Sequence, residues 1–201
     1  MGLNWVEDLV AHLYQIRGYM VIQDLDLPMP KTESRSVRGH SDVDVLAINE
    51  TEIIHIECQS WWGPDRASES KELHQLKARF DHAPETIRAR FPFLKLESKF
   101  LNVFVTSGKP KKGQGKGPWS RLQDFCAKEC IDLREINMVI RDLIVELRKK
   151  YPRPDRVGKE PPLARFLLHL IHNNFLSENT EQPLHRYNLP ADGQVDGERR
   201  R

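Results

Sequence analysis

Residues 41–48 read SDVDVLAI and residues 53–60 read IIHIECQS, with the polar stretch NETE at 49–52 between them. Both runs are rich in apolar and β-branched residues, which is typical of strands covered on both faces. A short polar stretch between two such runs predicts a β-hairpin. We place the centre of the turn between residues 50 and 51, and this choice sets which side chains face each other.

With that turn, Asp44 lies opposite Glu57 and Asp42 lies opposite Gln59. Directly opposed residues have Cβ atoms about 4.5–5.5 Å apart, so carboxylates converge at the open end of the hairpin. Like charges repel there unless a cation lies between them, and oxygen ligands without cysteine indicate Mg²⁺ or Mn²⁺ rather than zinc. If the turn is offset by one or two residues, these acids only solvate the end of a strand.

The rest of the chain alternates helical and extended patterns. Helices are expected at 4–17, 66–83, 119–129, 138–150 and 163–176, and strands at 19–28, 41–48, 53–60, 100–106 and 131–136. Alternation of this kind predicts an α/β domain whose sheet carries helices on both faces.

Three parts are expected along the chain. Residues 1–152 form the α/β domain, residues 153–177 are a Pro-rich linker with an apolar C-terminal helix, and residues 178–201 are polar and expected to be disordered. The C-terminal helix would either pack back on the domain or form a homodimer contact. Its expected buried stripe consists of Leu163, Phe166, Leu167, Leu170 and Ile171.

Composition limits the classes of protein that this chain can belong to. The 31 Lys and Arg residues nearly balance the 29 Asp and Glu residues, and the net charge of +2 excludes a strongly cationic coat. Any surface that binds a polyanion is therefore a local patch. No apolar run reaches the ~18 residues of a membrane span, and the N-terminus does not resemble a signal peptide. Three cysteines do not predict a disulfide framework, so we expect a cytoplasmic protein without membrane contact.

Several short stretches, in order, resemble the PD-(D/E)XK nuclease superfamily, and most closely its Mrr-type restriction endonucleases and archaeal Holliday-junction resolvases. The matching stretches are WVEDLVA (5–11), GHSDVDVLA (39–47), IHIECQS (54–60), LHQLK (73–77) and VFVTS (103–107). The resemblance covers about residues 4–136 and rests on the order and spacing of degenerate motifs. It implies a restriction-endonuclease-like fold, with a central mixed β-sheet flanked by helices on both faces.

The resemblance also implies roles for individual residues. Asp44 matches the metal-binding aspartate, Glu57 matches the acid of the (D/E)-x-K motif, and Glu7 matches the glutamate of the first helix. These carboxylates, with the main-chain carbonyl of Cys58, would bind Mg²⁺ or Mn²⁺. Gln59 would orient the attacking water. The implied activity is metal-dependent hydrolysis of phosphodiester bonds in DNA, in restriction, repair or defence.

Gln59 departs from the pattern, because the superfamily usually has lysine at this position. A glutamine amide is neutral, so a nearby cation such as Lys71, Lys77 or Arg66 would have to supply the positive charge. The alternative is a catalytically inactive module of nuclease fold that binds nucleic acid or scaffolds a complex. RNA is a third, weaker candidate substrate. Asp42 could be a further ligand or could anchor the loop before the strand.

Basic and aromatic residues around the hairpin are candidates for nucleic-acid binding. Lysines and arginines contact phosphates without reading sequence, and aromatic rings stack on bases of any kind. The two tryptophans that follow the second strand could stack on a splayed base or could pack in the core. The candidates are Lys31, Arg35, Arg38, Lys109, Lys111, Lys112, Lys116, Trp61 and Trp62.

Overall fold

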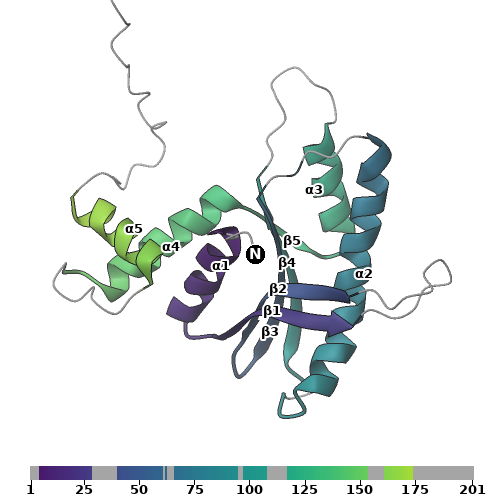
Figure 1. Ribbon diagram of the computed structural model, residues 1–201, viewed down its shortest axis with the longest axis horizontal. Coiled ribbons are helices and arrows are strands. Elements are labelled where there is room, and N and C mark those ends of the chain that lie inside the picture. The colour runs from purple at the N-terminus through teal and green to yellow at the C-terminus, as the bar shows by residue number, and fades with distance from the viewer. Residues whose placement is uncertain are drawn as a thin grey trace, which may run out of the picture.

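The computed structural model describes residues 5–28, 40–60, 62, 66–94, 97–107, 117–153 and 161–173. In chain order the elements are α1 (Trp5–Ile16), β1 (Met20–Pro28), β2 (His40–Ile48), β3 (Glu52–Gln59), α2 (Arg66–Arg90), β4 (Lys99–Thr106), α3 (Pro118–Lys128), β5 (Asp132–Glu135), α4 (Ile136–Lys150) and α5 (Pro162–His172). The chain has an α/β fold, as expected, and helices flank a single five-stranded sheet (Figure 1).

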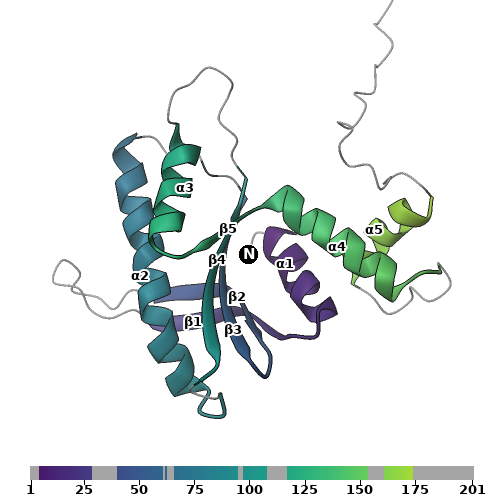
Figure 2. The ribbon, with the colours of Figure 1, turned by 180° about the vertical axis from the view of Figure 1, so that it is seen from behind.

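The sheet is mixed, and its strand order follows the chain from β1 to β5. β1, β2 and β3 are antiparallel neighbours, whereas β4 runs parallel to β3 and β5 runs parallel to β4. The parallel pairs need crossover connections, which α2 and α3 supply. The view from behind shows these two helices beside β4 and β5 (Figure 2).

The predicted hairpin register is confirmed along four pairs, which run from Val45 opposite Ile56 to Ile48 opposite Ile53. Asn49 stabilises the turn, because its side-chain oxygen accepts hydrogen bonds from the backbone N–H groups of Thr51 and Glu52 at 2.9 and 2.8 Å. Asparagine closes turns in this way by hydrogen bonding to the backbone a few residues ahead. The centre of the turn is therefore where the sequence predicted it.

Pairing between β2 and β3, as described, ends at Val45, one residue before Asp44. The alternation of side chains along β2 also breaks there, because Val43 and Val45 belong to hydrophobic clusters on opposite faces of the sheet. On β1, Asp24 is not paired with β2, although the neighbouring pairs place it opposite Asp44. Its φ of 51° lies in the left-handed region. β1 and β2 are thus both irregular at this point, and β2 leaves β3 beyond it.

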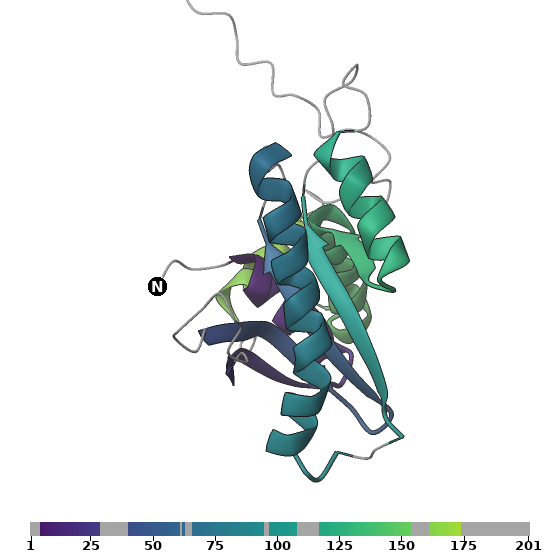
Figure 3. The same cartoon turned by 90° about the vertical axis from the view of Figure 1, so that its right-hand side faces the viewer.

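Helices cover both faces of the sheet, as predicted. α1, α4 and α5 contribute to the cluster on one face, which includes Val45 and Ile56, while α2 and α3 pack on the other face (Figures 1 and 3). The completely buried residues of β2 and β3 include Val45, Leu46, Ala47, Ile53 and Ile56. The apolar character of these strands on both sides reflects burial on both faces.

α2 is longer than predicted, because the expected helix stopped at residue 83 and the observed helix continues to Arg90 through Pro84. A proline inside a helix removes one hydrogen bond and costs about 3 kcal/mol. Ala83 and Ile87, on either side of the proline, are completely buried against the sheet. Packing of this second half of the helix offsets the unfavourable local preference.

α5 packs back on the domain, in the same cluster as α1 and α4. The predicted buried stripe is wrong at Phe166, which is 57% exposed, while Leu168 is fully buried in its place. The buried face of the helix is thus rotated toward Ala164 and Leu168. None of the helices within the described ranges has the length and apolarity that crossing a bilayer requires.

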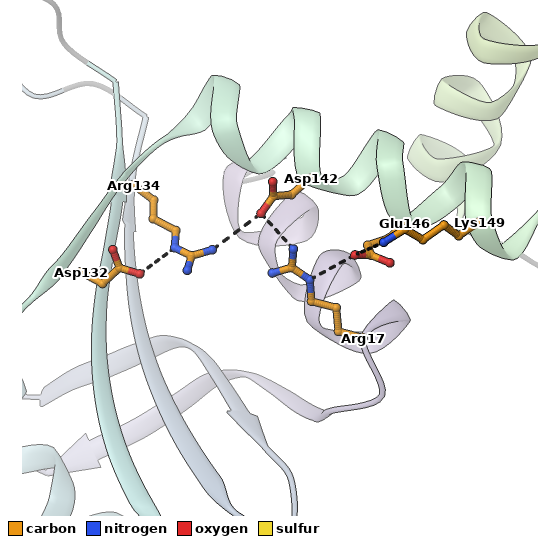
Figure 4. Close-up of polar contacts among 6 residues, drawn as sticks. All are labelled: Arg17, Asp132, Arg134, Asp142, Glu146 and Lys149. Atoms are coloured by element: carbon orange, nitrogen blue, oxygen red, sulfur yellow. Dashed lines mark hydrogen bonds and ion pairs between the residues drawn. The ribbon is translucent and has the colours of Figure 1, made fainter. Parts of the chain in front are cut away.

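Ion pairs join α1 to α4 and β5 on the outside of the domain (Figure 4). Arg17, just after α1, lies 2.9 Å from Asp142 and 3.8 Å from Glu146 of α4. Arg134 of β5 lies 2.8 Å from Asp132 and 3.8 Å from Asp142. Exposed pairs of this kind contribute about 0–1 kcal/mol each, so the apolar contacts beneath them dominate the packing of α1 on α4.

We predict that Leu168→Ala lowers the free energy of unfolding by about 2–5 kcal/mol, because it leaves a cavity in the core. Urea denaturation followed by circular dichroism measures this change. Phe166→Ala on the same helix is the matched control and should change the free energy by no more than about 0.5 kcal/mol, because this ring is exposed. Equal effects of the two substitutions would contradict the observed packing of α5.

Candidate functional site

A hollow of about 380 Å³ opens where β2 leaves β3. All four residues that the sequence predicted as catalytic line it, namely Glu7, Asp44, Glu57 and Gln59. We call this hollow the acidic pocket. Its other lining residues are Asp42, Cys58, Trp62, Glu72, Gln75, Leu76, Arg79 and Phe104.

Asp44 is half-buried at the base of the pocket, and its Oδ2 accepts the backbone N–H of Cys58 at 2.5 Å. This bond connects the two strands just past the last regular pair. Burial and the charge of Glu57, with smaller contributions from Glu7 and Asp42, raise the pKa of Asp44 to about 8, although the hydrogen bond from the Cys58 N–H acts to lower it. The carboxyl group of Asp44 therefore lies among other acids, and their repulsion is not balanced by positive charge beside it.

Glu57 is almost fully buried, with 1% of its area exposed. Its Oε1 lies 2.7 Å from Nε2 of His55, and its Oε2 accepts a hydrogen bond of 2.6 Å from Nη1 of Arg79. Glu57 and Asp44 meet in the pocket as predicted, although the regular ladder ends before them. The bend of β2 and the Cys58 N–H, rather than direct cross-strand pairing, bring them together.

His55 is completely buried beneath Glu57, and its ring packs edge-on against Phe80 at 4.7 Å between ring centres. Because the Glu57 oxygen is an acceptor, Nε2 of His55 carries the proton and donates it. Among the described residues, no hydrogen-bond partner reaches Nδ1 of His55. His55 thus holds one oxygen of Glu57 from the protein interior and leaves the other oxygen to the pocket side.

Arg79 is the site residue that the sequence analysis missed. It lies on α2 and its side chain is 38% exposed, so it connects the buried Glu57 carboxylate with the open side of the pocket. Partial burial acts to lower the pKa of Arg79, but the charges of Glu57, Asp44 and Asp42 outweigh it and raise this pKa. Helical spacing could have revealed Arg79, because it follows Gln75 at i+4 and Leu76 at i+3 and so shares their face of α2.

Two of the three cations that the sequence analysis proposed to replace the missing lysine, Lys71 and Lys77, do not line the pocket. Lys77 lies on another side of α2, where its Nζ is 2.5 Å from Glu129 and 3.2 Å from Asp81. Lys71 is exposed and does not line the pocket. The side chain of Arg66 lies outside the described residues.

The ligands available in the pocket are oxygen atoms. Burial, and then the charges of Asp44, Glu7 and Glu57, raise the pKa of the Cys58 thiol, which therefore stays protonated and is a poor metal ligand. Within the described ranges, no three His, Cys, Asp or Glu side chains are grouped closely enough to hold one ion. Mg²⁺ commonly uses only one or two carboxylates and completes its shell with water, so the donor set fits this ion.

Trp62 lines the pocket but belongs to the core. Its ring is 3% exposed, packs edge-on against Phe104 at 5.8 Å and donates Nε1–H to the carbonyl of Pro118 at 3.3 Å. The burial of Trp62 favours core packing over stacking on a base.

The remaining candidates for nucleic-acid binding lie outside the described residues, and they are Lys31, Arg35, Arg38, Trp61, Lys109, Lys111, Lys112 and Lys116.

Comparisons with known proteins add a structural likeness without a function. No protein-family model matches the chain, and no curated protein matches it. The crystal structure of a protein of unknown function, AF1548, is similar, with 12% identity and a TM-score of 0.42 over 85% of this chain and 98% of that one. A likeness of this size carries no argument about activity.

We predict that His55→Phe lowers the free energy of unfolding by about 1–3 kcal/mol, because Oε1 of the buried Glu57 loses its donor. Phenylalanine keeps the aromatic packing on Phe80, so the change tests the hydrogen bond. The double variant His55→Phe/Glu57→Leu should be more stable than the sum of the single changes predicts, by about 0.5–3 kcal/mol in urea denaturation. Additive effects would show that the two side chains are not coupled.

Proposed function

We propose that the protein is a metal-dependent endonuclease that hydrolyses phosphodiester bonds in DNA. The observation that carries this proposal is the convergence of Glu7, Asp44, Glu57 and Gln59 in one pocket. These residues come from α1, β2 and β3, and they are the set that the resemblance to PD-(D/E)XK nucleases selects. A pocket that collects them from distant stretches of chain is the arrangement that such chemistry requires.

The charge of the pocket supports a role for a divalent cation. Of the charged residues that line the described pocket, five are acidic (Glu7, Asp42, Asp44, Glu57 and Glu72) and one is basic (Arg79). A phosphodiester is itself an anion and is repelled by such a surface. Bound metal ions would reverse the local field, as they commonly are the largest charges in sites of this kind.

Asp44, Glu57 and the main-chain carbonyl of Cys58 would hold the metal ion, with Glu7 as an outer ligand or a ligand of a second ion. When bound, Mg²⁺ or Mn²⁺ would supply a water of lowered pKa and stabilise charge that develops at the phosphorus. These side chains are suited to the task because the structure already fixes them. Asp44 is held by the Cys58 N–H and Glu57 by His55.

In the reaction, a water oxygen forms a bond to phosphorus and one ester P–O bond breaks. The attacking water loses a proton, the departing oxygen gains one, and the products are a phosphomonoester and a free hydroxyl. Gln59 would orient the attacking water through its amide oxygen or nitrogen. Glu57 itself is almost fully buried, and electrostatic interactions are stronger at such a position than in bulk water.

The fold is compatible with this proposal at the finer level of a restriction-endonuclease-like domain. An antiparallel meander, β1–β3, leads through α2 into the parallel strands β4 and β5. The acids lie at the bend of the meander, between α1 and α2. DNA is the proposed partner, and a homodimer through the exposed side of α5, where Phe166 lies, is a further proposal.

A second candidate function is a catalytically inactive nuclease fold that binds nucleic acid or scaffolds a complex. Two observations favour it. Both oxygens of Glu57 already have protein partners, His55 and Arg79, which could replace a metal ion. Gln59, moreover, cannot supply the charge that a lysine would.

We predict that the purified chain cuts DNA in Mg²⁺ or Mn²⁺, and that Asp44→Ala and Glu57→Ala each slow cutting by more than about 10²-fold, because charge stabilisation is lost. The assay uses supercoiled plasmid and labelled single-stranded, branched and duplex DNA, with a matching RNA as the test of the RNA alternative. Calorimetric titration with Mn²⁺ should show weaker binding for both variants.

Asp81→Ala is the matched control, because this acid lies on α2 outside the pocket and pairs with Lys77. It should cut as the unaltered chain does. Cutting that persists in the Asp44 and Glu57 variants would disprove the assignment of the site. Salt-sensitive binding of DNA without cutting in either metal would instead support the inactive module.

A further inference from the structure

One basic side chain, that of Arg79, lines the acidic pocket at a position suited to contact with a substrate. Arg79 lies on the face of α2 that also presents Glu72, Gln75 and Leu76 to the pocket. These positions recur at the spacing of one helix face. α2 is a helix of 25 residues, and Phe80, the residue after Arg79, is buried in the core beneath it, so this part of the helix is fixed.

Among the described contacts of Arg79, only one nitrogen of the guanidinium donates a hydrogen bond. Nη1 donates to Oε2 of Glu57 at 2.6 Å, and this is the one hydrogen bond or ion pair of Arg79 among the described residues. A guanidinium carries several N–H donors in a planar fork that matches phosphate oxygens. With Nη1 held on Glu57, the donors on Nε and Nη2 remain available, and the side chain as a whole is 38% exposed.

The neighbouring cation on α2 lies outside the acidic pocket. Lys77, two residues earlier on α2, lies in a different hollow with Glu129 and Phe125, and its Nζ is bound to Glu129 and Asp81. Arg79 is therefore the only basic side chain among the described residues that line the acidic pocket. A phosphate that enters the pocket is repelled by its acidic side chains, and Arg79 is placed to offset this repulsion.

We propose that Arg79 is the residue that contacts the phosphate to be cleaved, and that it supplies the positive charge missing at Gln59. The inference rests on the proposed nuclease function and names the group that recognises the substrate anion. One edge of the guanidinium stays on Glu57, and the other donates to the non-bridging phosphate oxygens. As bonds to phosphorus form and break, charge grows on these oxygens, and donors already in place stabilise it.

Substitutions at Arg79 test this role against that of a structural support for Glu57. We expect Arg79→Ala to slow DNA cutting by about 10²-fold, the usual cost of losing one such donor. Mn²⁺ affinity, measured by calorimetry without DNA, should stay equal or become tighter, because a positive charge beside the metal ligands is removed. Arg79→Lys should keep part of the rate, since it retains a charge.

A second substitution tests whether the charge itself matters. Gln59 lines the same pocket, so Arg79→Ala/Gln59→Lys returns a cation to it and should recover part of the lost rate. Lys77→Ala is the matched control, a cation on the same helix outside the pocket, and should cut normally. Thermal unfolding of each variant verifies that the fold is intact.

The outcomes separate this inference from the proposed function. If the unaltered chain cuts nucleic acid in neither Mg²⁺ nor Mn²⁺, the proposed function fails and the role of Arg79 fails with it. If the unaltered chain cuts and Arg79→Ala cuts equally fast, only the inference is overturned. The inference is also overturned if Arg79→Ala loses Mn²⁺ binding and cutting together, because Arg79 then only supports Glu57.

Discussion

The end of the β2–β3 ladder at Val45 is the constraint on which the site depends. Had regular pairing continued, Asp44 and Glu57 would oppose each other directly, and a buried pair of like charges would destabilise the sheet. The bend moves Asp44 out of the ladder and gives it the Cys58 N–H instead. The space that opens between the two strands becomes the acidic pocket.

Glu57 shows how the fold tolerates a buried charge at this point. An ionised carboxylate taken out of water without partners is strongly unfavourable, so each oxygen needs a donor. His55 supplies one from the interior, and Arg79 supplies the other from α2. The interior donor fixes the carboxylate, whereas the exposed donor links it to whatever occupies the pocket. His55 therefore holds the Glu57 carboxylate in position, while Arg79 connects it to the pocket.

The surrounding architecture holds the two sides of this site apart. α1 brings Glu7 from one face of the sheet, and α2 brings Arg79 from the other (Figure 3). α4 and α5 pack behind α1 in one continuous apolar cluster, and ion pairs around Arg17 cover the outer edge of that contact. The packing of α4 and α5 therefore supports α1, the helix that carries Glu7, against the sheet.

The sequence by itself determined the order of elements, the hairpin and its register, because strand alternation and turn chemistry are local properties. It also selected Asp44 and Glu57 as neighbours. Tertiary structure alone decided the bend at Asp44, the course of α2 through Pro84 and the place of Arg79. These depend on packing between distant segments, since burial of Ile87 outweighs the local cost of proline and helix orientation sets which cation reaches Glu57.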